Sequence, residues 1–146
     1  MKPLEIIRHF FALPLLLAVL ASAANAHAEV VVIVSAKSPV TSLTPEQTAR
    51  IFLGKTSEFP GDGDAVPIDQ AVGSDIRNEF YARVVRKNPS QLAAYWAKII
   101  FTGDGRPPEI VDGNAAVRKA VAKNPNAIGY IDKSAVNRTV RVILAP

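Results

Sequence analysis

The sequence predicts one α/β domain in which helices flank a mixed sheet. The segment 29–35 (EVVVIVS) is continuously apolar and β-branched, which is typical of a strand buried on both faces. The segment 44–54 begins with helix-starting residues and ends with a glycine. The segment 65–80 reads as a short strand, a tight loop and the first turns of a helix. This succession of strands and helices is typical of α/β folds.

The first 28 residues are predicted to be a secretory signal peptide and not part of the fold. Lys2 and Arg8 make its start positive, the segment 10–21 is apolar, and small residues surround Ala26 and Ala28, where cleavage is expected. The apolar run is too short for a comfortable membrane span, which needs roughly 20 residues. The alternative is an uncleaved membrane anchor. Cleavage would release a secreted protein.

Cleavage after Ala28 leaves residues 29–146, a length that suits a single domain with one core. The chain has no cysteine, and its two histidines, His9 and His27, precede this domain. Cys/His zinc sites, thiol nucleophiles and histidine-based triads are therefore excluded from it, and no metal or cofactor is expected. Loss of the signal lowers the formal net charge from +4 to +3 without leaving a run of Lys and Arg, so no nucleic acid partner is expected.

Local signals predict the other elements. Thr44, Pro45 and Gln47 form a helix start with a capping box, and Gly54 is placed to end that helix. Three further helices are expected, each with one apolar side facing inward. The first begins at Ser74 and has Ile76, Phe80 and Val84 inward; the second is capped by Ser90 and has Leu92, Trp96, Ile99 and Ile100 inward; the third is capped by Asn114 and has Val117, Ala120 and Val121 inward. Two closing strands are expected over 127–131 and 139–144.

The turn at Ser74 is the main candidate for a ligand site. A serine at a helix start accepts a hydrogen bond from the amide two or three residues on. The amides of Asp75, Ile76 and Arg77 lie at the positive end of the helix dipole, which favours anions. Two interpretations stay open: Ser74 only caps the helix, or it binds an anion together with these amides.

Four further segments carry a family resemblance: IFLGKTSEFP (51–60), AVPIDQAVGSDIRNEFYARVV (65–85), AYWAKIIFTGDGRPP (94–108) and NAIGYIDKSAV (126–136). Together they resemble one lobe of the periplasmic phosphate-binding proteins of ABC transporters, a PstS-like family with the type II periplasmic solute-binding fold. The resemblance covers most of the domain, and the IFLGK helix end and the AIGY strand are its most specific parts. It implies a single α/β lobe with ligand contacts at helix N-termini.

The resemblance also implies which residues contact the ligand. In the family the matching turn reads approximately Arg-x-x-Gly-Ser-Gly-Thr, and its Arg, Ser and Thr side chains and its amides hold the phosphate. Gly73 and Ser74 match this pattern, whereas Gln70, Asp75 and Ile76 replace the Arg, the second Gly and the Thr. The cationic clamp and one hydroxyl are therefore missing, and a carboxylate is added. The candidate ligand-binding residues are Gln70, Gly73, Ser74, Asp75, Ile76, Arg77 and Arg106.

Two arginines are candidate substitutes for the missing clamp. Arg77 lies one residue past the Thr position of the family turn. Arg106 is the cation of the glycine- and proline-rich loop 101–108, where it either clamps an oxyanion in a bidentate manner or is solvated.

Three functions remain open at this point. The first is a periplasmic solute-binding-like protein that binds phosphate or another small oxyanion in uptake or sensing. The second is a ligand-free lobe that acts as a protein-interaction module in the cell envelope, which the departures from the family turn favour. An enzyme is the least favoured, because the domain has no histidine or cysteine to act as nucleophile or base. One lobe offers about half the contacts of a two-lobed clamp, so tight binding requires a homodimer or a transporter or envelope protein partner.

Overall fold

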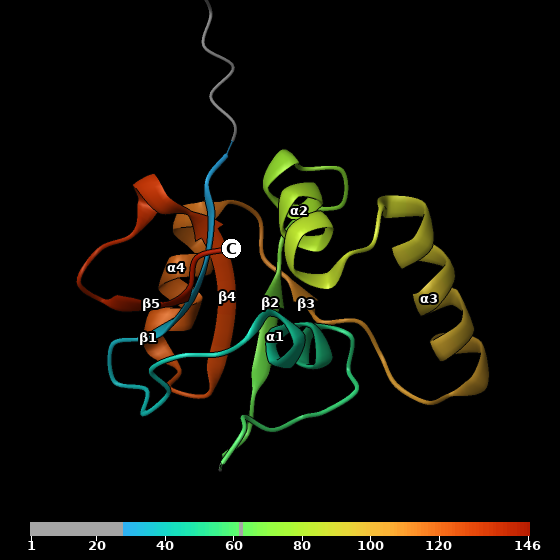
Figure 1. Cartoon of the computed structure of the whole chain (residues 1–146), viewed down its shortest axis with the longest axis horizontal. Helices are drawn as coiled ribbons and strands as arrows, with labels where there is room; N and C mark the ends of the chain where they lie inside the picture. The colour runs from blue at the N-terminus through green and yellow to red at the C-terminus, as the bar shows by residue number, and fades with distance from the viewer. Residues whose placement is uncertain (1–27, 62) are drawn as a thin grey trace, which may run out of the picture.

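The computed structural model describes residues 28–61 and 63–146, so the predicted signal peptide lies outside the described residues except for Ala28. Within these ranges the chain forms a five-stranded sheet in the order β3-β2-β4-β1-β5 (Figure 1). The strands are β1 (Val30–Ser35), β2 (Val66–Asp69), β3 (Glu109–Ile110), β4 (Ala127–Asp132) and β5 (Val140–Leu144). The helical segments are α1 (Pro45–Phe52), α2 (Asp75–Phe80), the π-helical turn η1 (Tyr81–Val85), α3 (Pro89–Thr102), α4 (Asn114–Lys123) and the 3-10 turn η2 (Lys133–Ala135).

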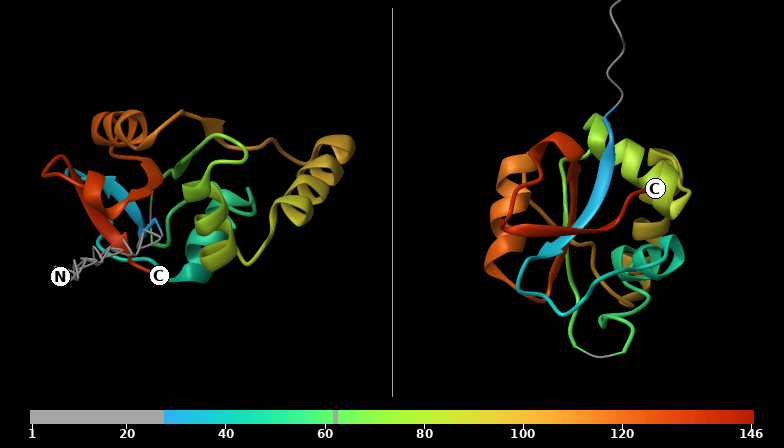
Figure 2. Two further views of the ribbon diagram at one scale, coloured as in Figure 1. Left: turned by 90° about the horizontal axis from the view of Figure 1, so that it is seen from above. Right: turned by 60° about the vertical axis from the view of Figure 1, so that its left-hand side comes forward.

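The sheet is mixed, as predicted. β1 pairs antiparallel with β4 and β5, whereas β2 pairs parallel with β3 and β4. α4 lies on one side of the sheet, and α1 and α2 lie on the other (Figure 2, right). In the described part of the chain, no helix is long and apolar enough to cross a membrane.

The strand β1 is buried on both faces, as its continuous apolar sequence predicts. Its side chains alternate between two cores because successive residues of a strand point to opposite faces. Val31 and Ile33 pack with Val117 and Val121 of α4. The side chains of Val30, Val32 and Val34 belong to the core beneath α1 and α2.

The helices α1 and α3 begin with the same chemistry. Thr44 and Gln47 form the predicted capping box of α1. The cap of α3 is Asn88, whereas the sequence predicted Ser90. The reason is that Pro89 lacks a backbone N–H and suits the first helical position, so the cap must precede it.

The helix α3 is also more exposed than predicted. Leu92 and Trp96 are buried, but Ile100, which was expected to face inward, is 57% exposed. Only a narrow side of α3, which carries Leu92 and Trp96, faces the core. Ile100 lies beyond the edge of that side.

A tight contact between α4 and β4 depends on Gly129. A Cβ atom at this position would lie 2.8 Å from Cγ1 of Val117 and 3.0 Å from Cγ2 of Val121, and both valines are fully buried. Gly129→Ala should therefore lower the free energy of unfolding by about 1–3 kcal/mol, as overpacked cores do. Urea denaturation measures the loss. The control is Gly105→Ala, whose Cβ would meet only Ile99 at 3.4 Å; an equal loss in both variants would contradict this account of the helix–strand contact.

Candidate functional site

The turn that follows β2 places Ser74 at the start of α2. Gly73 has a φ of +85°, a left-handed conformation that glycine adopts without strain. Ser74 has extended backbone angles and lies at the cap position, but its side chain makes no capping hydrogen bond. Within the described residues its buried Oγ atom has no hydrogen-bond partner. The predicted capping bond is therefore absent, and the turn leaves one buried hydroxyl without a partner.

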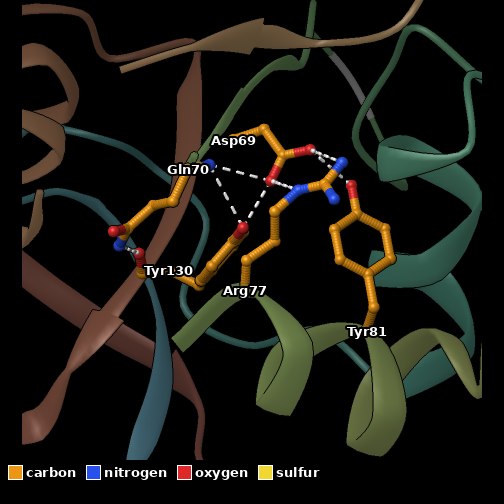
Figure 3. A network of polar contacts seen from close by, with 5 residues as sticks. All are labelled: Asp69, Gln70, Arg77, Tyr81 and Tyr130. Carbon is orange, nitrogen blue, oxygen red and sulfur yellow. Dashed lines mark hydrogen bonds and ion pairs between the residues drawn. The ribbon is translucent and has the colours of Figure 1, made fainter. Parts of the chain in front are cut away.

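Directly behind this turn, Asp69 holds a buried polar network (Figure 3). Asp69 is 1% exposed and accepts hydrogen bonds from the Tyr81 hydroxyl at 2.7 Å, from the Tyr130 hydroxyl and from the Gln70 amide at 2.8 Å. Arg77 reaches the same carboxylate in a bidentate manner: its Nε lies 3.3 Å from Oδ1 and its Nη2 lies 3.4 Å from Oδ2. Four donors thus converge on one carboxylate.

The two tyrosines of this network act as neutral donors. Burial raises the pKa of Tyr81 and of Tyr130 well above the usual value, and the negative charge of Asp69 raises both further. The guanidinium of Arg77 also lies 5.0 Å from the centre of the Tyr81 ring. The guanidinium of Arg77 is therefore the buried counter-ion of the Asp69 carboxylate.

The side chain of Gln70 is directed into the protein as well. It is 2% exposed, and its Nε2 donates to the carbonyl of Tyr130 at 2.9 Å and to Oδ1 of Asn114 at 3.1 Å. The same Asn114 oxygen accepts from the amide of Asp132 at 3.1 Å. Asn114 is the first residue of α4, and the residue at its cap position is Gly113. Gln70 and Asn114 together tie the turn to α4 and β4.

The sequence did not indicate this role for Asn114. We predicted it as a helix cap because Asn is common there. Its contact with Gln70 joins residues 44 positions apart, so it depends on the order of β2 and β4 in the sheet. The sequence also did not indicate that the Tyr130 hydroxyl donates to Asp69, since the AIGY segment reads as an apolar strand.

An open groove of about 810 Å³ borders the start of α2, and Asp75 and Ile76 line it. Three carboxylates, those of Glu29, Asp75 and Asp132, face one lysine, Lys133, whose Nζ lies 3.3 Å from Oε1 of Glu29. Hydrogen bonds from the Ser134 side chain and amide hold the pKa of Asp132 below its usual value. The groove is therefore negatively charged at neutral pH, which disfavours a fully deprotonated anion.

The remaining candidate, Arg106, lies apart from this groove. It lines a second groove of about 620 Å³ together with Gly54, Thr56 and Pro67. Pro67 belongs to the first half of β2, whereas Ser74 follows the end of that strand. The fold therefore brings Gly73, Ser74, Asp75 and Ile76 together at one turn, places Gln70 and Arg77 behind it, and leaves Arg106 elsewhere.

No protein-family model matches the chain, and no curated protein matches its sequence significantly. Solved structures do match. A protein described as a phosphate ABC transporter substrate-binding protein with bound phosphate, from Clostridium perfringens, has a TM-score of 0.63 and 26% identity over 79% of this chain and 44% of that one. An ABC-type phosphate transport receptor from Vibrio cholerae has a TM-score of 0.62 and 22% identity, over 79% and 45%. PstS from Borrelia burgdorferi has a TM-score of 0.59 and 16% identity, over 79% and 46%.

These matches confirm the resemblance to phosphate ABC transporter substrate-binding proteins in fold. The chain is similar to a part of each of them and spans less than half of their length. The predicted single-lobe architecture agrees with this coverage.

Proposed function

We propose that this chain is a single-lobe solute-binding-type protein of the cell envelope whose ligand is a small protonated oxyanion such as dihydrogen phosphate. The premise is the fold that it shares with phosphate-binding proteins. The observation that carries the proposal is the buried hydroxyl of Ser74, which lacks a hydrogen-bond partner in the described part of the chain. Buried polar groups are normally paired, and an oxyanion at the start of α2 would pair this one.

The charges around the groove explain why the oxyanion should keep a proton. Asp75 and Asp132 accept hydrogen bonds but cannot donate them when ionised. Dihydrogen phosphate can donate to a carboxylate, whereas sulfate carries no proton at neutral pH and would be repelled. Phosphate should therefore bind in preference to sulfate, and more strongly at pH 6 than at pH 8, where more of the phosphate is doubly charged.

The expected affinity is low. Arg77 is committed to Asp69, and Gln70 and Ile76 supply neither the cation nor the hydroxyl of the family turn. Each charge-assisted hydrogen bond is worth about 1.5–3 kcal/mol, and every 1.4 kcal/mol is about a factor of ten in affinity. A monomer should therefore bind phosphate with a dissociation constant in the millimolar range, unless a partner supplies a second wall.

The test is an NMR titration of ¹⁵N-labelled signal-free protein (29–146) with phosphate at pH 6, with sulfate at equal ionic strength as the comparison. Saturable shifts confined to the amides of residues 75–77 are expected with phosphate only. Ser74→Ala should raise the dissociation constant obtained from these shifts about five- to tenfold, since it removes one hydrogen bond to the anion. Ser90→Ala, at an exposed position on α3, should leave them unchanged.

A specific observation favours a second candidate function, that of a ligand-free lobe that binds another envelope protein. The bidentate pair between Arg77 and Asp69 turns a cation away from the position where an anion would need it. If the amides of residues 75–77 do not respond to millimolar phosphate, oxyanion binding is rejected. The next experiment would then be capture of one reproducible partner from periplasmic extract, with Asp75→Arg as the control variant that alters the groove.

A further inference from the structure

Glu29, the residue before β1, is held at three points at the edge of the groove. Its backbone amide donates to Oδ2 of Asp132 at 3.1 Å, and its carbonyl oxygen accepts from the amide of Lys133 at 2.8 Å. Its side-chain Oε1 lies 3.3 Å from Nζ of Lys133. Ala28 and Glu29 line the same groove as Asp75, at the end of the molecule where β1 and α2 begin (Figure 1). The backbone nitrogen of Glu29 is therefore fixed beside a carboxylate in this groove.

The carboxylate of Asp132 is itself well positioned. Its Oδ1 accepts from the Ser134 hydroxyl at 2.6 Å and from the Ser134 amide at 2.9 Å, and the amide of Asp132 donates to Oδ1 of Asn114 at 3.1 Å. The hydrogen bonds from Ser134 lower the pKa of Asp132, so this carboxylate is ionised at neutral pH. Over residues 28–61 and 63–146, Asp132 forms no ion pair. One neutral N–H, that of Glu29, therefore faces a full negative charge.

A chain that begins at Glu29 would carry an ammonium group in place of this amide. The run Ala26-His27-Ala28 fits the small-residue pattern of a signal cleavage site, with the cut at the bond that precedes Glu29. An amide donates one hydrogen atom, whereas an ammonium group is positively charged and donates three. Hydrogen bonds between charged groups are roughly twice as strong as those between neutral groups. The position of Asp132 therefore suits the cut chain better than the uncut one.

We propose that the chain is cut between Ala28 and Glu29 and that Asp132 holds the new α-ammonium group in an ion pair at the edge of the groove. A signal peptidase adds water across the peptide bond, so that the carbonyl carbon of Ala28 becomes a carboxylate and the nitrogen of Glu29 an ammonium. A cut after Ala26 would leave this nitrogen as an amide and place the charge two residues away, or about 7 Å along an extended chain.

The new charge changes the electrostatics of the groove. The lining side chains of Glu29, Asp75, Asp132 and Lys133 give a formal charge of −2, and the α-ammonium group raises it to −1. Asp132 uses one hydrogen atom of this group, and two remain for a ligand or water. Since Gln70 replaces the arginine of the family turn, the new N-terminus would supply a cation that the turn lacks. This consequence rests on the proposed function, whereas the ion pair does not.

The first test locates the cut. The full chain, expressed in a bacterial host that exports it, should yield a mature protein whose intact mass and N-terminal sequence begin at Glu29. A mature protein that begins at His27, or a chain that keeps its first 28 residues, would overturn the proposal.

The second test titrates the ammonium group in protein that begins at Glu29, made by removal of a fusion tag that leaves no extra residue. The ¹³Cα chemical shift of this residue follows the titration. Because Asp132 stabilises the charged form, the midpoint should lie about one pH unit above that of a short peptide with the same first two residues, a tenfold gain in proton affinity. Asp132→Asn should remove most of this gain.

The matched control is Asp75→Asn, which removes an equal charge from the same groove and should remove less than half of the gain. The ¹H–¹⁵N spectrum would establish that both variants stay folded. Equal midpoints in the protein and the peptide, or equal effects of the two substitutions, would overturn the ion pair.

Acetylation of the α-amino group connects the ion pair to the proposed function. It removes the positive charge but keeps one N–H for Asp132, so it should raise the dissociation constant for phosphate at pH 6 about tenfold. Equal dissociation constants for the free and acetylated chains would overturn the role of the ammonium group in ligand binding. Absence of phosphate binding by both chains would reject the oxyanion function instead, and the titration midpoint would still decide the ion pair.

Discussion

Replacement of Arg77 with methionine is expected to lower the free energy of unfolding by about 3–5 kcal/mol. The physical reason is that Asp69 is 1% exposed and that the substitution leaves its buried carboxyl group without the counter-ion. Loss of one partner of a buried ion pair costs about this much because the other charge stays desolvated and unpaired. Since a domain of this size is stabilised by only about 5–15 kcal/mol, urea denaturation should show a large fall in the midpoint.

Two further variants separate the ion pair from other effects of the substitution. Arg83→Met removes an arginine from an exposed pair with Glu79 on the same helical segment and should cost about 0.5 kcal/mol or less. The double variant Asp69→Asn/Arg77→Met removes both charges of the buried pair and should be more stable than Arg77→Met alone. If the double variant loses the sum of its two single losses, the residues are not coupled and our account of the network is wrong.

Replacement of Phe80 with alanine should produce a loss of similar size, about 3–5 kcal/mol, as is typical when a buried aromatic ring is truncated. Phe80 is fully buried and stacks on Tyr130, with ring centroids 4.0 Å apart and planes at 5°. It also contacts the edge of Phe52, with ring centroids 4.7 Å apart. The cavity would lie between α2, α1 and β4, where the structure has few ways to close it.

The matched control is Phe101→Ala on α3. Phe101 is 92% exposed, so its truncation should change the free energy of unfolding by no more than about 0.5 kcal/mol. Equal losses of stability for Phe80→Ala and Phe101→Ala in dilute solution would contradict the burial assigned to these two rings.

The sequence predicts the fold correctly where a local pattern of residues is compatible with only one local structure. The apolar run of β1 can be satisfied only between two layers, and the structure buries it on both faces. The capping box at Thr44 determines the start of α1 because both partners are three residues apart. The position of Ser74 at the start of α2 follows from the strand–loop–helix pattern in the same way.

The candidate site is different, because its side chains are paired by distant residues. The resemblance to the family turn made Gln70 and Arg77 candidates for contact with an anion. In the structure Gln70 donates hydrogen bonds to Tyr130 and Asn114, and Arg77 donates to Asp69. Tyr130 comes from β4, and its place beside β2 is decided by the strand order. No local pattern encodes such pairings.

The sequence by itself thus determined the α/β class, the start of α1 and the position of the turn at Ser74, since these depend on interactions within a few residues. The tertiary structure alone decided that the charge of Arg77 is balanced inside the protein, that Arg106 lies in a different groove and that one side of α3 is uncovered. The physical reason is that the direction of a polar side chain depends on which buried partner lies within hydrogen-bond distance, and that partner is supplied by the packing of strands and helices far apart in the chain.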